Sequence, residues 1–419
     1  MSAIANLLVS APKTPSFRPI DPPYPERTSV VFICRQRSCG GRWISRPIRA
    51  CLSSDKVGGE GGDHDVRSAS TKRLSFGKQL LSIASDNFLP LALVSGVVIG
   101  LANPVPGCLA DKYSLSKFST FGIFIISGLT LRSDAVGAAV KSWAVGVFGL
   151  FSILFFTPFF SRLIMQIQLQ PQELVTGLAI FSCMPTTLSS GVALTHLAGG
   201  NSALALAMTL ISNLLGILII PIWISKYIAA GMGVSIPTGQ LFRSLIVTLL
   251  IPLIIGKVMR ESFKGLADFV DGNRKLFSKI SAIFLSLVPW MQVSRSRSLL
   301  LMVKPAVFLA AVGMGILLHL SLLAFNALSI RIISSVSGGR NSAFSREENV
   351  TAVLLVASQK TLPVMVAVVQ QLGGAFGEPG LLVLPCVAAH LIQIVMDSFL
   401  VSFWLRKYNT SSSVSPKAA

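Results

Sequence analysis

Two long apolar stretches of the chain are interrupted in the middle by polar residues and prolines. The first, 174–197, contains Ser182-Cys183-Met184-Pro185-Thr186-Thr187-Leu188-Ser189-Ser190-Gly191, and the second, 350–372, contains Ser358-Gln359-Lys360-Thr361-Leu362-Pro363. Backbone polar groups at bilayer depth cannot face lipid, so interrupted membrane helices line a cavity enclosed by protein. Paired interruptions in matching positions of two halves indicate the binding site of a secondary transporter. The sequence therefore predicts a transporter whose site lies where the two interruptions meet.

The composition is typical of a membrane protein. Hydrophobic residues make up 52% of the chain and charged residues 13%, whereas about a quarter of the residues in soluble domains are charged. A membrane-spanning helix needs about 20 apolar residues. We expect an all-α membrane protein with about ten transmembrane helices, of which the second and seventh are the shortest: 88–105, 115–131, 142–160, 174–198, 202–225, 241–258, 277–293, 305–327, 349–371 and 380–404.

The order of these spans predicts an internal repeat. Five spans fall in 88–229 and five in 238–405, and the interrupted span is the fourth of each set. An odd number of spans per repeat places the second copy upside down in the membrane, so the two interrupted helices cross near the midplane. Their half-helix ends, which carry partial charges, then point at the site.

The first 54 residues have the composition of a targeting segment. They contain eight Lys or Arg residues, only Asp21 and Glu26 as acids, and many Ser and Pro residues. Such a composition is typical of an organellar transit peptide, and the prolines argue against the amphipathic helix of a mitochondrial one. We predict a chloroplast transit peptide over 1–54, a disordered linker over 55–87 and a disordered tail over 406–419. The alternative is that the first segment is a plain disordered tail.

The net charge of +19 does not predict a nucleic-acid partner, because the basic residues follow the expected topology. From residue 72 onward, 17 Lys or Arg residues lie on the side of the membrane that carries both ends of the span region and 8 on the other. Basic loops stay in the compartment from which a membrane protein inserts. We therefore expect a multi-pass protein of the inner chloroplast envelope with the basic side in the stroma.

No motif of an enzyme or of a cofactor site is present in the sequence. The six cysteines lack metal-binding spacing, and the chain contains no phosphate loop, nucleophile elbow or HExxH motif. We expect no enzymatic activity and no cofactor, apart from a sodium ion.

Two motifs resemble the bile acid:sodium symporter (BASS) family. The segment from Cys183 to Val192 is similar to the fourth span of that family, and the segment from Gly200 to Thr209 is similar to its Gly-Asn-x-Ala-Leu-Ser-x-Ala-Met-Thr motif. The resemblance covers about 88–405. Together with the plastid-type leader, it resembles the chloroplastic sodium/metabolite cotransporters of the family, in the branch whose ninth span reads Ser-Gln-Lys-Thr.

The resemblance implies a panel domain and a core domain, with two sodium ions held where helices four and nine cross. Its sodium ligands fall here on Ser190, Thr209 and Gln359, but its other ligands are replaced by Gly191, Ala205 and Leu355, and Lys360 replaces an Asn. We therefore expect transport to depend on sodium weakly or not at all. The candidate residues for binding substrate or ion are Pro185, Thr186, Thr187, Ser190, Thr209, Gln359, Lys360 and Thr361.

Lys360 is the residue whose role is most open, because an ionisable side chain near the bilayer centre is costly and is functional by default. Its ammonium could take the place of a sodium ion, exchange a proton, or bind an anionic substrate. The non-functional alternative is a lysine that reaches the interface along its apolar stem. Asp397 could neutralise Lys360 or a basic neighbour, or be solvated near the end of its span. His196, His319 and His390 are expected to be packing partners.

Three functions remain compatible with the sequence. The first is a sodium-coupled carrier of a small organic anion or metabolite that works by alternating access. The second is a proton-coupled or uncoupled carrier in which Lys360 replaces the sodium ion. The third is a membrane regulator or scaffold that does not transport. The lipid bilayer is a partner in each of them.

Overall fold

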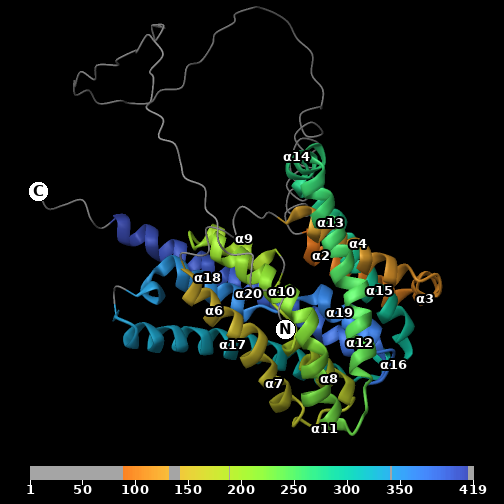
Figure 1. Ribbon diagram of the computed structural model, residues 1–419. Helices are drawn as coiled ribbons and strands as arrows, with labels where there is room; N and C mark the ends of the chain where they lie inside the picture. Colours follow the sequence, from red (N-terminus) through yellow and green to blue (C-terminus); the bar gives the residue numbers. More distant parts are fainter. Residues whose placement is uncertain (1–87, 132–141, 188, 340–341, 414–419) are drawn as a thin grey trace, which may run out of the picture. The chain divides into compact units, whose positions relative to one another are not determined.

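The computed structural model describes residues 88–131, 142–187, 189–339 and 342–413, and in these ranges every regular element is a helix (Figure 1). The predicted all-α class is confirmed. The predicted transit peptide and linker lie outside the described residues. The last helix, α20 (Pro379–Ser413), continues eight residues into the predicted tail because no Gly or Pro interrupts it there.

Seven described helices are long and apolar enough to cross a membrane, or eight if one bent pair counts as a span. The bent pair is α2 (Phe88–Ala102) and α3 (Pro104–Lys112), which meet at 103°. The first span ends three residues earlier than expected because Asn103 caps α3, its side chain accepting a hydrogen bond from Val105 N at 3.2 Å. The other two predicted spans fall on the shorter α4 (Leu115–Thr130) and on an interrupted helix, so the count of ten remains a prediction.

One group of helices, which we call the panel, comes from the first two spans of each predicted repeat. In two pairs of these helices a glycine of one helix lies directly against the backbone of the other. A Cβ atom on Gly96 of α2 would lie 2.9 Å from a carbonyl oxygen of α15, and one on Gly128 of α4 would lie 2.2 Å from a carbonyl oxygen of α13. The first predicted span thus packs on the seventh, and the second packs on the sixth. The symmetry of an inverted repeat relates these two contacts to each other. The panel comprises α2, α3, α4, α12 (Thr238–Leu245), η4 (Ile246–Leu250), α13 (Ile251–Ser262) and α15 (Arg274–Arg295).

The other spans, with the short helices that join them, form a second group, which we call the core. The same symmetry holds here. The third predicted span packs on the fourth (α7 on α8), and the eighth packs on the ninth (α17 on α18), so the second repeat reproduces a contact of the first. The core comprises α6 (Trp143–Phe151), η2 (Ser152–Phe156), α7 (Thr157–Ile164), α8 (Gln172–Ser182), α9 (Ser190–Leu197), α10 (Ser202–Trp223), η3 (Ile224–Ala229), α11 (Ala230–Met232), α17 (Pro305–Val336), η6 (Ala343–Ser345), α18 (Glu347–Ser358), α19 (Leu362–Gln371) and α20.

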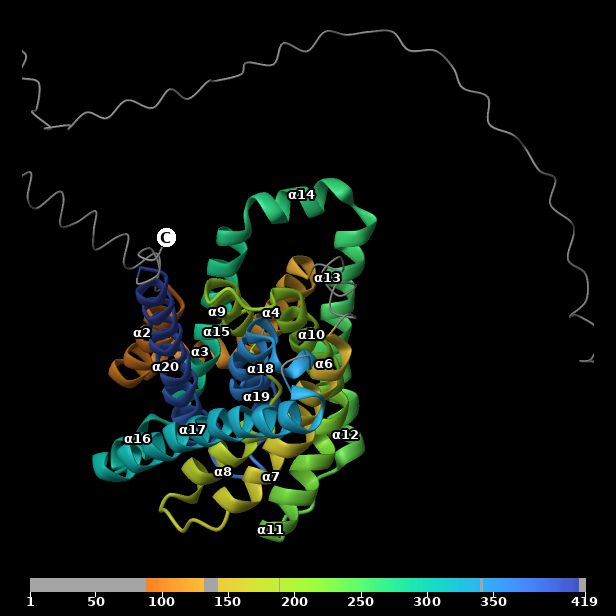
Figure 2. The same ribbon diagram turned by 90° about the vertical axis from the view of Figure 1, so that its left-hand side faces the viewer.

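The ninth predicted span lies deepest in the core. In the apolar window of α18 and α19, 89% is buried, a larger share than in any other candidate span of the described residues. Figure 2 shows these two helices in the middle of the view, with α17 crossing near them. Polar residues of this span therefore meet other protein groups rather than lipid.

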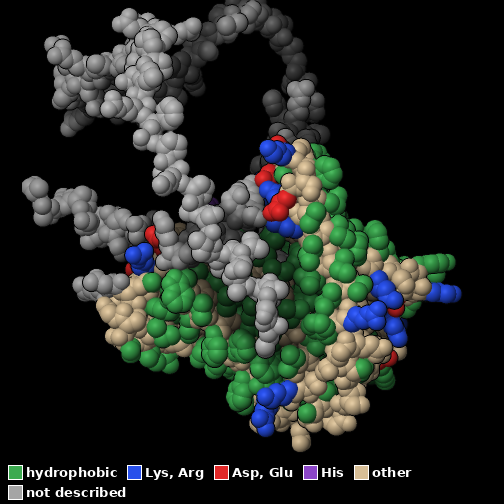
Figure 3. Space-filling model, in the orientation of Figure 1, with side chains coloured by type: hydrophobic (Ala, Val, Ile, Leu, Met, Phe, Trp, Pro, Cys, Tyr) green, Lys and Arg blue, Asp and Glu red, His purple; other side chains and the backbone are tan. Residues whose placement is uncertain are grey.

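The outer surface of the described part is apolar. Large side chains such as Val98, Phe118, Leu317 and Phe399 are exposed, and hydrophobic side chains cover much of the face in Figure 3, while Lys and Arg gather in small groups. Exposed apolar surface of this extent suits contact with lipid. One basic group caps α4: Lys257 and Arg260 of α13 donate to the carbonyl oxygens of Leu131 and Leu129 at 2.9 and 2.8 Å. This places cations at the negative end of that helix.

Candidate functional site

Both predicted interruptions are breaks between helices. The first lies between the end of α8 at Ser182 and the start of α9 at Ser190, and the second separates α18 from α19 over 359–361. Pro185 and Pro363 lie at the breaks, where a missing N–H and the ring prevent a continuous helix. The breaks are bonded to each other, since Thr361 N donates to the carbonyl oxygen of Pro185 at 2.9 Å. The predicted meeting of the fourth and ninth spans is confirmed.

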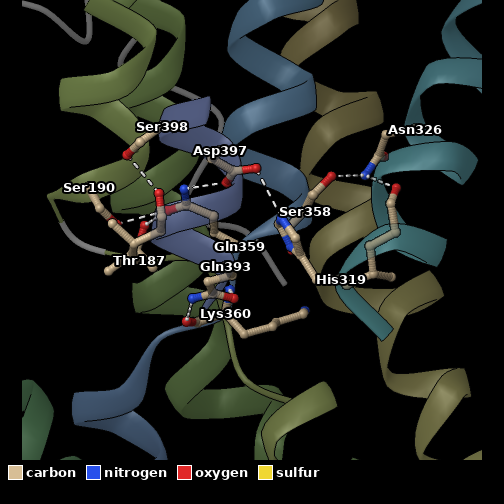
Figure 4. A network of polar contacts seen from close by, with 12 residues as sticks. Thr187, Ser190, His319, Asn326, Ser358, Gln359, Lys360, Gln393, Asp397 and Ser398 are labelled. Atoms are coloured by element: carbon tan, nitrogen blue, oxygen red, sulfur yellow. Dashed lines mark hydrogen bonds and ion pairs between the residues drawn. The ribbon is translucent and has the colours of Figure 1, made fainter. Parts of the chain in front are cut away.

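Side chains also join the two breaks (Figure 4). The Thr186 hydroxyl donates to the carbonyl oxygen of Val356 in α18. Gln359 Oε1 accepts hydrogen bonds from the hydroxyls of Thr187, at 2.6 Å, and Ser190, at 2.8 Å. The structure thus brings together Thr186, Thr187, Ser190 and Gln359, all of which the sequence predicted as site residues.

Lys360 is buried in the core, with 1% of its surface exposed. Its ammonium donates to the hydroxyl of Thr157 and to the carbonyl oxygens of Met184 and Ile153, at 2.8 and 3.5 Å for the two carbonyls. Met184 lies just beyond the C-terminal end of α8, where a helix attracts positive charge. The alternative of a lysine that reaches the interface is therefore wrong, because the side chain is directed into protein.

The unwound backbone at Lys360 is satisfied by α20. Lys360 N donates to Gln393 Oε1 at 3.1 Å, and Lys360 O accepts from Gln393 Nε2 at 2.6 Å and contacts His390 Nδ1 at 3.1 Å. Backbone groups freed by a break in a membrane helix need such partners. His390 is therefore a hydrogen-bonding residue of the break and not only a packing partner.

Asp397 belongs to the same network, although it does not pair with Lys360. It is fully buried; Oδ2 accepts from Gln359 Nε2 at 2.6 Å and Oδ1 lies 2.9 Å from His319 Nε2. His319 Nδ1 lies 3.1 Å from the carbonyl oxygen of Ser358, the last residue of α18. The carboxyl group is fully buried and its partners are Gln359 and His319, so the alternatives of a pair with Lys360 and of a solvated carboxylate are both wrong. The alternative of a basic neighbour fits the contact with His319. His319 is a hydrogen-bonding partner of the buried Asp397 carboxyl group rather than only a packing residue.

The third histidine, His196, differs from the other two. It is exposed and lies outside the network, and its Nδ1 is 3.2 Å from Ser202 Oγ. Among the described residues, its hydrogen-bonding contact is with Ser202 and not with either break.

Three buried oxygens near the breaks have no hydrogen-bond partner among the described residues: Thr209 Oγ1, Asn213 Oδ1 and Thr361 Oγ1. Asn213 adjoins the first break, because its Nδ2 donates to the carbonyl oxygens of Thr186 and Thr209 at 3.0 and 2.8 Å. A buried polar atom without a partner costs free energy. These oxygens are therefore available to a ligand or ion.

Sequence reasoning named Thr209 and Thr361 but missed Asn213 and Gln393. The sequence signal that could have identified them is their spacing from other polar residues on the same helix. Asn213 follows Thr209 by four residues, and Gln393 and Asp397 follow His390 by three and seven, so each set lies on one helix face.

The positions where family ligands are replaced bear on sodium binding. Leu355 is fully buried in α18 and supplies no oxygen. A Cβ atom on Gly191 would lie 3.2 Å from Thr187 Oγ1 and 3.5 Å from Gln359 Oε1, so this residue borders the bonded oxygens without adding one. The hydroxyl and amide oxygens at this point of the breaks are neutral.

The whole helical region matches a known family. The model of the SBF-like CPA transporter family matches residues 86–406. The "Probable sodium/metabolite cotransporter BASS4, chloroplastic" of Arabidopsis thaliana is 68% identical over 98% of this chain and 99% of that protein. The protein of the same name from Oryza sativa subsp. indica is 62% identical over 80% and 79%. The "Sodium/bile acid cotransporter 7" of Rattus norvegicus is 25% identical over 73% and 89%.

These matches agree with the all-helical membrane fold. The chloroplastic relatives, together with the apolar helices, indicate a chloroplast membrane protein. The chain belongs to the SBF-like CPA transporter family.

Proposed function

We propose that the protein is a secondary transporter that couples a small organic anion to sodium, and that panel and core move against each other in alternating access. The family supports transport, and the names of the similar proteins support sodium and a metabolite as the transported species. Sodium coupling is favoured over the proton-coupled, uncoupled and non-transporting alternatives, because these relatives are named as sodium cotransporters.

The observation that carries this proposal is the junction of the two breaks. Thr361 N and Pro185 O join the breaks, and buried oxygens without partners lie beside them on Thr209, Asn213 and Thr361. In transporters with broken helices, unwound backbone and half-helix C-terminal ends hold cations, while half-helix N-terminal ends favour anionic groups. The N-terminal ends of α9 and α19 adjoin the breaks here, which suits an organic anion.

The number of sodium ions is proposed to be one. Ser190, Thr209 and Gln359 retain oxygens for one cation, with Thr187 and Asn213 beside them. The Lys360 ammonium already supplies a positive charge at the end of α8. We therefore assign Lys360 as a resident cation in place of a second sodium ion, and we expect a shallow dependence of transport on sodium concentration.

The test is uptake by the purified protein in liposomes, from a pooled set of labelled organic acids. Accumulation driven by an inward sodium gradient is expected, and choline in place of sodium should abolish it. A pH gradient alone should not replace the sodium gradient. Uptake at the same rate with and without sodium, or no uptake of any acid in the set, would contradict the proposal.

We further propose that the protein lies in the inner chloroplast envelope, after removal of a transit peptide that ends between about residue 45 and 75. The basic leader and the chloroplastic relatives support this. Residues 1–75 fused to a fluorescent reporter are expected to direct it into chloroplasts. A reporter that stays in the cytosol, or enters only mitochondria, would contradict the assignment.

A further inference from the structure

The hydrogen bonds of Gln359 impose an orientation on its amide group. One end faces the Thr187 and Ser190 hydroxyls, and the other lies 2.6 Å from Asp397 Oδ2 (Figure 4). A hydroxyl either donates or accepts, so the two hydroxyls are compatible with either end of the amide. A carboxylate oxygen only accepts, so the NH2 end must face Asp397. The orientation of the amide is therefore set by Asp397 alone.

Asp397 is in turn held by His319. The carbonyl oxygen of Ser358 only accepts, so His319 Nδ1 must carry a proton to bond it. The contact between His319 Nε2 and Asp397 Oδ1 then needs a second proton, either on the ring or on the carboxyl group. In both cases Oδ2 remains an acceptor for Gln359. Pairing of this kind is what makes a fully buried carboxyl group tolerable.

This arrangement ties the breaks to helices that do not themselves break. His319 lies on α17 and Asp397 on α20, and both are long helices of the core. The relay from His319 through Asp397 to Gln359 is buried throughout, with 4% exposure at the histidine and none at the other two residues. Water is therefore not available to replace a lost partner.

We propose that Asp397, backed by His319, is a positioning residue that keeps the carbonyl oxygen of Gln359 directed at the sodium site. The proposal rests on the proposed sodium coupling and deepens it. A cation is attracted by the carbonyl end of an amide and repelled by the NH2 end. If Asp397 could not accept a hydrogen bond, Thr187 and Ser190 could receive the NH2 group instead, and the site would lose its oxygen.

Two substitutions at Asp397 separate position from charge. Asp397→Asn removes the charge but preserves both bonds, because its NH2 can donate to a singly protonated His319 and its oxygen can accept from Gln359. Asp397→Leu has the same branched shape with bulkier methyl groups, and it preserves neither bond. The matched control is Ser402→Ala, which removes only the exposed hydroxyl that donates to the carbonyl oxygen of Ser398 on the same helix.

The experiment titrates the purified full chain in detergent with sodium chloride against choline chloride at constant ionic strength, and follows the melting temperature. A ligand that binds the folded state raises the melting temperature with its concentration, which yields a half-saturating concentration. We expect the Asn variant and the control to stay within about threefold of the wild type, and the Leu variant to need at least about tenfold more sodium.

A third variant does not depend on how well the Leu variant folds. In the exchange Gln359→Glu with Asp397→Asn, a carboxylate oxygen faces the site whichever way it turns, and Asn donates to its other oxygen. Sodium should stabilise this protein at or below the wild-type concentration, whereas Gln359→Glu alone, which sets two carboxyl groups side by side, should be impaired.

The outcomes separate the two proposals. A wild type that sodium does not stabilise would overturn the sodium coupling, and this inference with it. A wild type that responds to sodium, with Asn and Leu variants equally weakened, would show that charge matters and position does not. A Leu variant with wild-type affinity, or an exchange variant no better than Gln359→Glu alone, would overturn the positioning role.

Discussion

Replacing Lys360 by Met is expected to leave the protein folded and to stop transport. Met retains much of the apolar stem and removes the ammonium, whose described acceptors are Thr157 Oγ1, Met184 O and, more distantly, Ile153 O. Thr157 keeps a partner, because its hydroxyl also donates to Ile153 O at 2.7 Å. The substitution therefore removes the bond of Met184 O, the closer of the two carbonyl acceptors.

The two effects on stability oppose each other and are of similar size. Leaving one buried carbonyl without a partner costs about 1–3 kcal/mol. Removing a buried charge that forms no ion pair with any described carboxylate relieves a desolvation penalty of several kcal/mol. The free energy of unfolding should therefore be unchanged or slightly raised. A loss of transport in the Met variant would therefore not be explained by unfolding of the protein.

The effect on transport is electrostatic. At an effective dielectric constant of about 20, two unit charges about 8 Å apart interact by about 2 kcal/mol, which corresponds to roughly a thirtyfold change in an equilibrium constant. An organic anion at the breaks loses this interaction in the Met variant. Lys360→Arg retains the charge, but its larger, planar group overfills a closed site at a cost of about 1–3 kcal/mol. The Arg variant should be impaired yet active.

The assay is uptake into liposomes at matched protein content, beside the melting temperature of each variant in detergent. We expect uptake in the order wild type, Arg variant, Met variant, with the Met variant at least about tenfold below wild type and no less stable. Full uptake by the Met variant would remove Lys360 from the mechanism. A Met variant that melts far below the wild type would refute the stability reasoning.

Two further predictions concern the scaffold. Asn201→Ala should lower the free energy of unfolding by about 1 kcal/mol or more, since Asn201 caps α10 through Leu204 N and also donates to Asn349; denaturation in detergent measures this, and no change would refute the capping role. Gly128→Val should disrupt the panel, because even a Cβ atom would lie 2.2 Å from Leu253 O, whereas Gly231→Ala, with nothing within 4 Å, should be nearly neutral; equal melting temperatures for the two variants would contradict the close contact of α4 and α13.

The sequence predicted the breaks well because proline and polar residues within an apolar helix have a direct physical meaning. Pro185 and Pro363 marked both interruptions, and the expected contact between them appears as the bond from Thr361 N to Pro185 O. The same segments contain Thr187, Ser190 and Gln359, which is why these residues could be predicted as members of the site. Lys360 was recognised as costly, although the direction of its side chain was not predictable.

The network behind the breaks could not be predicted in this way. Asp397 and His319 are 78 residues apart and lie on different helices, and nothing in either local segment indicates that they meet. Only tertiary packing shows that Asp397 faces Gln359 rather than Lys360 or solvent. The bend after Ala102 was also missed, although the capping residue Asn103 and Pro104 are present in the sequence as a signal for a new helix.

Sodium coupling at the joined breaks is tested most directly by measuring labelled sodium and labelled substrate together in liposomes that contain the purified wild-type protein. We expect the two to enter together, with a single sodium ion for each substrate, and Thr209→Val to raise the sodium concentration needed for half-maximal uptake. Substrate entry without sodium entry, or Thr209→Val with unchanged sodium dependence, would contradict the proposal that the joined breaks form a sodium-coupled site.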